Sequence, residues 1–314
     1  MVKKKRTLKK SNVRINKKYT FKCNNSDILN QLLTNIGFRE ETGNKIVDFS
    51  MWNTYISGDI KSKYKCINKK LVDPIDNKHI FYTIMKKYNL DNHTPKTYLV
   101  SELISDILER DKLYFLKYIH GAGGRSVYPV KTMDDIHRIV REDKLNYILQ
   151  EEVPNMYLYK DKYKTTMRNY VLVSDKGIYF YNEGYVYIYK TKYDKENLDN
   201  SIHNNIFTQC DYEPLSKQYY YPEILPKLCE ISSQLLHRYF RDIPLKDSYI
   251  ILGIDFIIDK NYKPYLIEIN GLPNLSSSCG EGSVKKQMIQ DFVNLYVLPK
   301  VIGKRSKRGG WIKI

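Results

Sequence analysis

The chain has 314 residues, of which 42% are hydrophobic and 13% aromatic, a composition typical of a folded globular protein rather than a disordered one. The sequence contains no run of 18 apolar residues, and its N-terminus is basic without an apolar core. A membrane span and a secretory signal are therefore not predicted, and a cytoplasmic protein is expected. The cysteines show neither zinc-ligand spacing nor a disulfide framework, so reduced thiols are predicted at Cys23, Cys66, Cys210, Cys229 and Cys279.

The formal net charge of +17 lies mainly at the two ends of the chain. Residues 1–18 contain nine Lys or Arg and no acid, residues 300–314 contain six and no acid, and the middle is nearly balanced. Basic ends can bind nucleic acid, address a protein to the nucleus, or hold an acidic polypeptide by long-range attraction. A solvated, disordered arm is the alternative interpretation of the first residues.

The first predicted elements form a small α/β module. The apolar spacing of residues 26–36 predicts a helix with Ser26 or Asp27 as its N-cap, and Gly37 closes it. Residues 46–52 then predict a strand. A second helix is predicted to start at residues 75–78 and to run to Tyr88.

A glycine-rich loop follows in the next part of the chain. Residues 93–100 predict a strand, residues 102–110 a helix, and residues 114–117 a strand that ends in Lys117, after which come Gly121, Gly123 and Gly124. The Gly-Lys-Ser/Thr of a Walker A loop is absent, which argues against a P-loop. This hairpin could still hold phosphates, because glycines let backbone N–H groups approach an anion and a lysine supplies positive charge. A flexible turn is the alternative.

Alternating patterns predict antiparallel strands further on. A helix is predicted over residues 134–142, and residues 146–150 form a short buried strand that ends at Gln150. Residues 164–173 and 177–189 alternate around a Ser-Asp-Lys-Gly turn, which predicts a hairpin. Arg168 would face whatever this sheet covers, although a surface arginine paired with a neighbouring acid is equally consistent with the pattern.

Residues 190–221 are polar and irregular, whereas residues 222–240 predict an amphipathic helix. After the hairpin described next, a last helix is predicted over residues 282–301, and the basic end of the chain follows.

The most informative stretch is residues 252–278, within which two strand-like runs, 253–258 and 265–269, form a predicted β-hairpin. Strand alternation points Asp255, Glu268 and Asn270 out of the apolar layer, so three oxygen ligands can converge. Hard cations such as Mg²⁺ take such ligands together with the phosphates of a nucleotide, which predicts a metal–nucleotide site. A half-buried hairpin with its polar face in water is the alternative.

In this order, the glycine loop, Gln150, Arg168 and the hairpin resemble the ATP-grasp ligases, and among them the tubulin–tyrosine ligase-like family of amino-acid ligases. The strongest match is the hairpin, where Gly253-x-Asp255 and Glu268-Ile269-Asn270-x-x-Pro273 fit the metal-binding pattern of the family. Similar residues also occur at Trp52-Asn53, Asn77-Lys78 and Thr94-Pro95-x-x-Tyr98. The resemblance covers residues 52–301.

The resemblance implies a mixed α/β protein with an ATP-grasp fold of three subdomains, in which the nucleotide lies between the central and C-terminal subdomains. The division expected on this basis is a basic, disordered arm at 1–18, an N-terminal α/β subdomain at 19–76, a central subdomain with the glycine loop at 77–152, a C-terminal subdomain with the metal-binding hairpin at 153–302, and a basic tail at 303–314.

The resemblance also implies four groups of site residues. The phosphates of ATP would be bound by two lysines and the glycine loop, namely Lys78, Lys117, Gly121, Gly123 and Gly124. The other nucleotide contacts would come from the hinge at the adenine and two further side chains, namely Gln150, Glu151, Glu152, Val153, Lys164 and Asn205. Mg²⁺, or Mn²⁺ in its place, would be held by Asp255, Glu268 and Asn270. The catalytic residues would be Lys117, Arg168 and Glu268.

The implied reaction is the activation of a carboxylate by ATP as an acyl-phosphate, followed by attack of an amino acid's amine to form an amide. The implied partners are free tyrosine, glutamate or glycine and an acidic polypeptide such as the tail of tubulin. A monomer is expected, without membrane or nucleic-acid partners. An ATP-grasp ligase for a small molecule or another protein, and a non-catalytic nucleic-acid-binding module, are the alternatives.

Several positions depart from the family pattern. Tyr118 stands where a proline is usual, Thr166 where an aspartate is usual, and Tyr187 where an arginine is expected. The segment before Asn205 also differs from the family sequence. The last two changes lie in the region that would hold the acceptor and the amino acid, so the substrates stay open.

Overall fold

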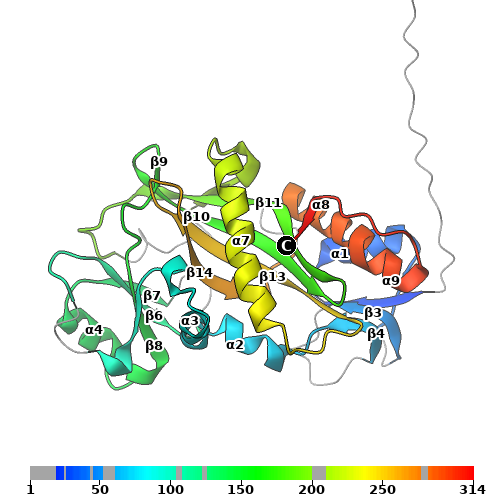
Figure 1. Ribbon diagram of the computed structural model, residues 1–314, viewed down its shortest axis with the longest axis horizontal. Coiled ribbons are helices and arrows are strands. Elements are labelled where there is room, and N and C mark those ends of the chain that lie inside the picture. Colours follow the sequence, from blue (N-terminus) through cyan, green and yellow to red (C-terminus); the bar gives the residue numbers. More distant parts are fainter. Residues whose placement is uncertain are drawn as a thin grey trace, which may run out of the picture. The chain divides into compact units, whose positions relative to one another are not determined.

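The computed structural model describes residues 19–24, 26–42, 45–51, 61–103, 108–121, 126–199, 210–276 and 282–314 (Figure 1). The chain divides into two compact units. The first unit comprises residues 1–66 and 274–307, and the second comprises residues 67–273 and 308–314. The five-part division expected from the sequence stays a prediction.

The first unit contains a parallel sheet. Its strands pair in the order β4 (Ser62–Cys66), β3 (Val47–Met51), β1 (Thr20–Cys23) and β2 (Arg39–Glu40). The helices of this unit are α1 (Asp27–Asn35), α8 (Gly282–Phe292) and α9 (Leu298–Ile302), with a π-helical turn at Val293–Val297. Helix α8 packs on the sheet through the rings of Phe49 and Phe292, whose centroids lie 6.3 Å apart.

The second unit begins with α2 (Asp73–Asp76) and α3 (Lys78–Lys87), followed by a four-stranded antiparallel sheet. Its order is β5 (Thr97–Leu99), β8 (Tyr147–Glu151), β6 (Tyr114–Tyr118) and β7 (Val127–Val130). Helix α4 (Met133–Val140) packs Ile136 and Val140 into a core with strand residues of this sheet.

A larger antiparallel sheet completes the second unit. The strands run β12 (Cys210–Pro214), β11 (Gly177–Lys192), β10 (Tyr163–Ser174), β13 (Ser248–Ile258) and β14 (Pro264–Asn270). Short strands β9 (Leu158–Tyr159) and β15 (Trp311–Lys313) pair with β10 and β11. Helix α7 (Tyr221–Tyr239) lies across one face of this sheet (Figure 1). Every residue of β13 is buried, as expected of a strand covered on both faces.

Most predicted elements are confirmed, with shifted ends. Ser26 caps α1 as expected, because its hydroxyl accepts the Leu29 N–H at 3.1 Å. The helix predicted over 102–110 is wrong for the residues described there: Val100–Glu102 form a 3₁₀ turn, and residues 108–110 are not helical. The four described cysteines are free thiols, and Cys279 lies outside the described residues. Among the described helices, none is long and apolar enough to cross a membrane.

Gly184 on β11 illustrates how tightly the long strands pack. A Cβ at this position would lie 2.5 Å from the carbonyl oxygen of Arg168 and 2.6 Å from Nδ2 of Asn169. Gly184→Ala should therefore lower the free energy of unfolding by about 3 kcal/mol in urea denaturation.

Gly303→Ala is the matched control, because no atom of the described residues lies within 4 Å of the Cβ that it adds. Its cost should come only from the left-handed backbone, φ 71°, and stay near 1 kcal/mol. Equal losses for the two variants would contradict this account of Gly184.

Candidate functional site

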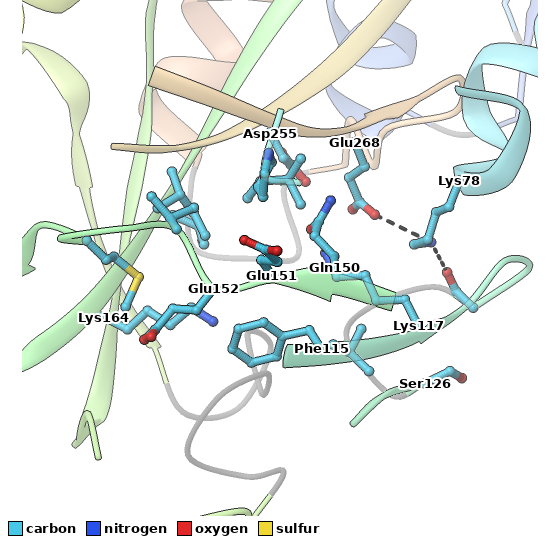
Figure 2. Close-up of a pocket in the computed structure, with 18 of the residues that line it drawn as sticks. Lys78, Phe115, Lys117, Ser126, Gln150, Glu151, Glu152, Lys164, Asp255 and Glu268 are labelled. Atoms are coloured by element: carbon cyan, nitrogen blue, oxygen red, sulfur yellow. Dashed lines mark hydrogen bonds and ion pairs between the residues drawn. The ribbon is translucent and has the colours of Figure 1, made fainter. Parts of the chain in front are cut away.

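The second unit holds a cavity with about 850 Å³ of empty space, part of it open to solvent. Figure 2 shows the side chains from β6 and β8 that line it facing those from the β13–β14 hairpin. Much of its wall is apolar, formed by Pro95, Phe115, Val127, Val153, Met156, Ile257 and Ile267.

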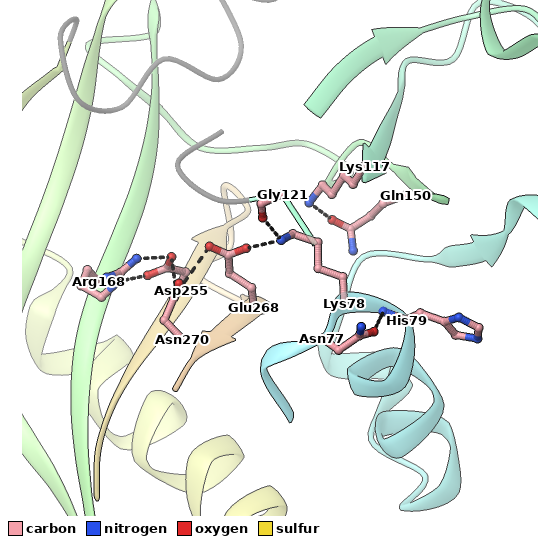
Figure 3. A network of polar contacts seen from close by, with 10 residues as sticks. All are labelled: Asn77, Lys78, His79, Lys117, Gly121, Gln150, Arg168, Asp255, Glu268 and Asn270. Atoms are coloured by element: carbon pink, nitrogen blue, oxygen red, sulfur yellow. Dashed lines mark hydrogen bonds and ion pairs between the residues drawn. The ribbon is translucent and has the colours of Figure 1, made fainter. Parts of the chain in front are cut away.

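The hairpin supplies the acidic corner of this cavity. Arg168 on β10 pairs in register with Asp255 on β13, which pairs with Glu268 on β14, so the three side chains form one row across three strands. The amide Nδ2 of Asn270 lies 3.4 Å from Oδ2 of Asp255 and 3.4 Å from Oε1 of Glu268 (Figure 3). The structure thus brings together all three predicted metal ligands.

Arg168 holds Asp255 through two parallel hydrogen bonds. Its Nη2 donates to Oδ2 at 2.7 Å, and its Nε donates to Oδ1. Burial raises the pKa of Asp255 to about 6, although the guanidinium opposes this shift. Burial would also raise the pKa of Glu268, but the attraction of Lys78, Arg168 and Lys117 outweighs it and lowers that pKa to about 2. Both carboxylates are therefore mainly ionised at neutral pH.

This donor set fits a hard divalent cation. Two carboxylates and an amide that can turn its oxygen inward are the ligand types that Mg²⁺ takes. In the described part of the chain, no cluster of three or more His, Cys, Asp or Glu side chains could hold a metal. A cation at this corner would thus depend on few protein ligands, as Mg²⁺ does when substrate phosphates complete its coordination.

Lys78 connects this corner with the start of the glycine loop. It is the first residue of α3, which Asn77 caps by accepting the N–H groups of His79 and Ile80 at 3.0 and 3.1 Å. The Lys78 Nζ donates to the carbonyl oxygen of Gly121 at 2.6 Å and lies 3.5 Å from Oε2 of Glu268 (Figure 3). The cap thus fixes the position from which this ammonium group reaches both partners.

Lys117 is a second cation of the cavity, and Gln150 positions it. The Lys117 Nζ donates to Oε1 of Gln150 at 2.5 Å, and Nε2 of Gln150 donates to the hydroxyl of Thr97 at 3.0 Å. Burial lowers the pKa of Lys117 to about 7. Both ends of the Gln150 amide already have protein partners, so its side chain orients Lys117.

The carboxylates of the predicted hinge are also held by protein groups. Glu151 accepts a hydrogen bond from the Tyr98 hydroxyl at 2.7 Å and pairs with Lys112 at 2.6 Å. Glu152 accepts a hydrogen bond from the Tyr193 hydroxyl. The Val153 N–H, by contrast, donates to no acceptor in the part of the chain that the structure describes. This backbone group is therefore open to a ligand beside the apolar wall.

Lys164 lies deeper, against two aromatic rings. Its Nζ is 4.6 Å from the ring centroid of Phe115 and 5.6 Å from that of Tyr189. Burial lowers the pKa of this ammonium to about 8. Figure 2 shows Lys164 beside Phe115 and Glu152, which places a third cation in the same cavity.

The remaining predictions for this site lie outside the described residues. They concern Gly123, Gly124, Asn205 and the pair Trp52-Asn53. Their roles stay predictions.

Asp76 was not singled out from the sequence. Burial raises its pKa, and its carboxylate accepts a hydrogen bond from the backbone of Gly271, directly after β14. A Cβ on Gly271 would lie 2.7 Å from Cγ1 of Val72, so α2 and the end of the hairpin are in close contact. Asp76 therefore supports the segment that carries Glu268 and Asn270. An acid on a short helix gives no sequence signal for this role.

Comparisons with known proteins agree with this geometry. A family model described as the tubulin-tyrosine ligase family matches residues 223–305, which include the whole hairpin. The chain is 28% identical over 215 residues to tubulin glycylase 3B of Tetrahymena thermophila, covering 59% of this chain and 18% of that protein. It is 24% identical over 234 residues to "Probable tubulin polyglutamylase ttll-9" of Caenorhabditis elegans, covering 64% of this chain and 56% of that protein.

The chain therefore spans less than a fifth of the length of the first relative and little more than half of the length of the second. The matches extend well beyond the hairpin, and the mixed α/β architecture with its antiparallel sheets is ATP-grasp-like, which confirms the predicted fold class. The family model and the two relatives thus support the resemblance of this chain to the tubulin–tyrosine ligase-like family.

Proposed function

We propose that this protein is an ATP-dependent carboxylate–amine ligase that joins an amino acid to an acidic polypeptide tail, with tubulin as the first candidate acceptor. The observation that carries this proposal is the cavity in which Lys78 and Lys117 lie with the carboxylates of Asp255 and Glu268, while Arg168 pairs with Asp255. Such a site can bring two anions together, a nucleotide phosphate and a carboxylate, which would otherwise repel each other. The names of the two relatives, a tubulin glycylase and a probable tubulin polyglutamylase, support the choice of acceptor.

The nucleotide would lie with its base against the apolar wall of Val153, Met156 and Ile257. The open N–H of Val153 could donate to a ring nitrogen of the base, and Lys164 would contribute a further polar contact at this end. The phosphates would extend toward Lys78 and Lys117. The distribution of apolar and cationic groups along the cavity supports this orientation.

In the proposed reaction, an oxygen of the acceptor carboxylate attacks the terminal phosphorus of ATP, and the bond to ADP breaks. The amine of the amino acid then attacks the acyl carbon, an amide forms, phosphate leaves, and the amine loses a proton to solvent. Mg²⁺, held by Asp255, Glu268 and Asn270, would neutralise phosphate charge. Lys78 and Lys117 would orient the transferred group, and Arg168 would stabilise negative charge beside it.

A label-transfer assay tests this function. The protein is incubated with ATP, Mg²⁺ and one labelled amino acid at a time, with intact tubulin, tubulin without its acidic tails, or a glutamate-rich peptide as acceptor. Label on intact tubulin or on the peptide, but not on tail-free tubulin, is the expected result. ADP release without any labelled polypeptide would favour a small-molecule ligase. If neither ADP nor a labelled polypeptide forms, the result would favour a non-catalytic module.

Binding of ATP near pH 8 should take up about one proton per site, because the phosphates stabilise the charged form of Lys117 directly and that of Lys164 over a longer distance, and burial has lowered the pKa of both lysines. Lys117, with a pKa of about 7, is mostly neutral at this pH in the free protein, and Lys164, with a pKa of about 8, is half neutral. Toward pH 6 both are already charged, so the uptake should disappear.

Calorimetry with a non-hydrolysable ATP analogue, in buffers of different ionisation enthalpy, measures this uptake. Lys117→Met should remove much of it, whereas Lys144→Met, a change at an exposed position, should not. An uptake that grows as the pH falls would contradict the assignment.

A further inference from the structure

The positive charge of the protein belongs mainly to the first unit, which contributes no residue to the cavity. Residues 19–66 and 274–307 contain 12 Lys or Arg and seven Asp or Glu, and residues 1–18 add nine Lys or Arg and no acid. The second unit contains 31 Lys or Arg and 28 Asp or Glu, so it is nearly neutral. Fourteen of the 17 excess charges therefore lie in the unit that contributes no residue to the cavity.

Six of these cations form two exposed groups, which we call the basic rim. The first group is carried by β4 and the residue before it, where alternation exposes every second side chain, and the second follows α9. The members are Lys61, Lys63, Lys65, Lys304, Arg305 and Lys307. Tyr64 connects β4 with α9, the helix that the second group follows, because its ring lies 5.2 Å from Nζ of Lys63 and 5.5 Å from Nζ of Lys300 on α9.

The segment after α9 is held in place by its backbone and by one hydroxyl. Lys307 donates its N–H to the carbonyl oxygen of Asn294 at 3.2 Å, and the hydroxyl of Ser306 donates to the carbonyl oxygen of Leu295 at 2.9 Å. Lys304 donates its N–H to Leu298 at 3.4 Å. The cationic side chains are therefore presented from a fixed backbone.

The rim cations have no acidic partner within the described residues. Two acids of the first unit have other partners: Asp48 accepts two hydrogen bonds from Thr20, and Glu41 lies 3.6 Å from Arg39. Asp291 is buried and accepts a hydrogen bond from Gln287. Because the rim cations are exposed and have no acidic partner among the described residues, they can attract an external polyanion.

We propose that the basic rim is a docking surface for a glutamate-rich segment of the acceptor protein, and it shares no residue with the cavity in which the chemistry would occur. The identity of this partner rests on the proposed function, whereas the position of the surface rests on charge and exposure alone. Extended carboxylate side chains complement scattered lysine and arginine groups, and the attraction would raise the local concentration of the acceptor. A nearly neutral second unit could then bind the reacting carboxylate by fit rather than by net charge.

Two rim variants and a matched control test this surface in the full chain. The variants are Lys304→Gln/Arg305→Gln/Lys307→Gln and Lys61→Gln/Lys63→Gln/Lys65→Gln. The control, Lys144→Gln/Lys176→Gln/Lys246→Gln, removes the same charge from exposed positions of the second unit. A fluorescein-labelled glutamate-rich peptide is titrated by anisotropy at low and at moderate salt, alongside a short DNA duplex and phosphatidylserine–phosphatidylcholine vesicles.

Each rim variant should bind the peptide roughly tenfold more weakly than the control variant at low salt, and the difference should shrink as salt screens the charges. Unequal losses for the two rim variants, both greater than the control, still support the surface. Equal binding by all three variants, or tighter rim-dependent binding of DNA or vesicles than of the peptide, would overturn the proposal.

Ligation with the same peptide as acceptor separates this proposal from the proposed function. If ligation occurs, the rim variants should raise the KM for the peptide and leave the kcat unchanged, and an unchanged KM would count against the rim. If ligation never occurs but peptide binding depends on the rim, the proposed function fails and the docking surface stands.

Discussion

Replacing Glu268 with glutamine should lower the rate of ligation by about 100-fold or more while leaving the fold intact. The amide has nearly the same shape as the carboxylate, but it removes one of the two negative charges at the hairpin corner and the ion pair with Lys78. Mg²⁺ and the phosphates would then lose both charge balance and a ligand. The rate of ADP formation and the unfolding midpoint measure the two effects.

Glu142→Gln is the control, since Glu142 is exposed and is not among the residues that line the cavity. It should turn over at the normal rate. Near-normal turnover by Glu268→Gln in the same assay would remove the basis for assigning a metal ligand at this position.

Arg168→Met should destabilise the protein by about 3–5 kcal/mol, because it leaves the carboxylate of Asp255 buried without its guanidinium partner. Methionine keeps the length of the aliphatic stem, so the loss comes mainly from the charge. Ligation should also fall by about 100-fold or more, since no other cation forms this contact with Asp255 in the described structure. Urea denaturation gives the first quantity and steady-state kinetics the second.

The double variant Arg168→Met/Asp255→Asn separates stability from chemistry. Removing the orphaned charge should restore much of the free energy of unfolding, whereas activity should stay lost. If Arg168→Met is as stable as the wild type, the pair of Arg168 and Asp255 contributes nothing to stability. If the double variant turns over at the normal rate, neither residue has a role in catalysis.

The parts of the site that follow from strand alternation could be predicted. Asp255, Glu268 and Asn270 face one side because the period of a strand is two, and Arg168 joins them because β10 pairs with β13 in register. The hydrogen bond from Lys117 to Gln150 and the rings around Lys164 depend on which strands become neighbours. Local sequence does not contain that information, so these contacts appeared only in the fold.

The C-terminal strand was missed for a related reason. Its neighbourhood is rich in Lys and Arg, which favours a solvated tail. Yet Trp311 is buried, its ring centroid lies 4.9 Å from that of Tyr181, and β15 pairs with β11. Burial of one indole outweighs the polar character of the residues around it. The helix predicted over residues 102–110 shows the reverse case in the residues described there, where a helical pattern did not give a helix.

The central claim is that ATP activates a carboxylate of the acceptor, and an isotope experiment tests it most directly. A glutamate-rich acceptor labelled with oxygen-18 in its carboxylates is incubated with the protein, ATP, Mg²⁺ and the amino acid that the label-transfer assay selects. Mass spectrometry then follows the released phosphate. Attack by the carboxylate on the terminal phosphorus predicts one labelled oxygen in phosphate for each amide bond formed, together with ADP. Amide formation with unlabelled phosphate, or with AMP in place of ADP, would contradict the account.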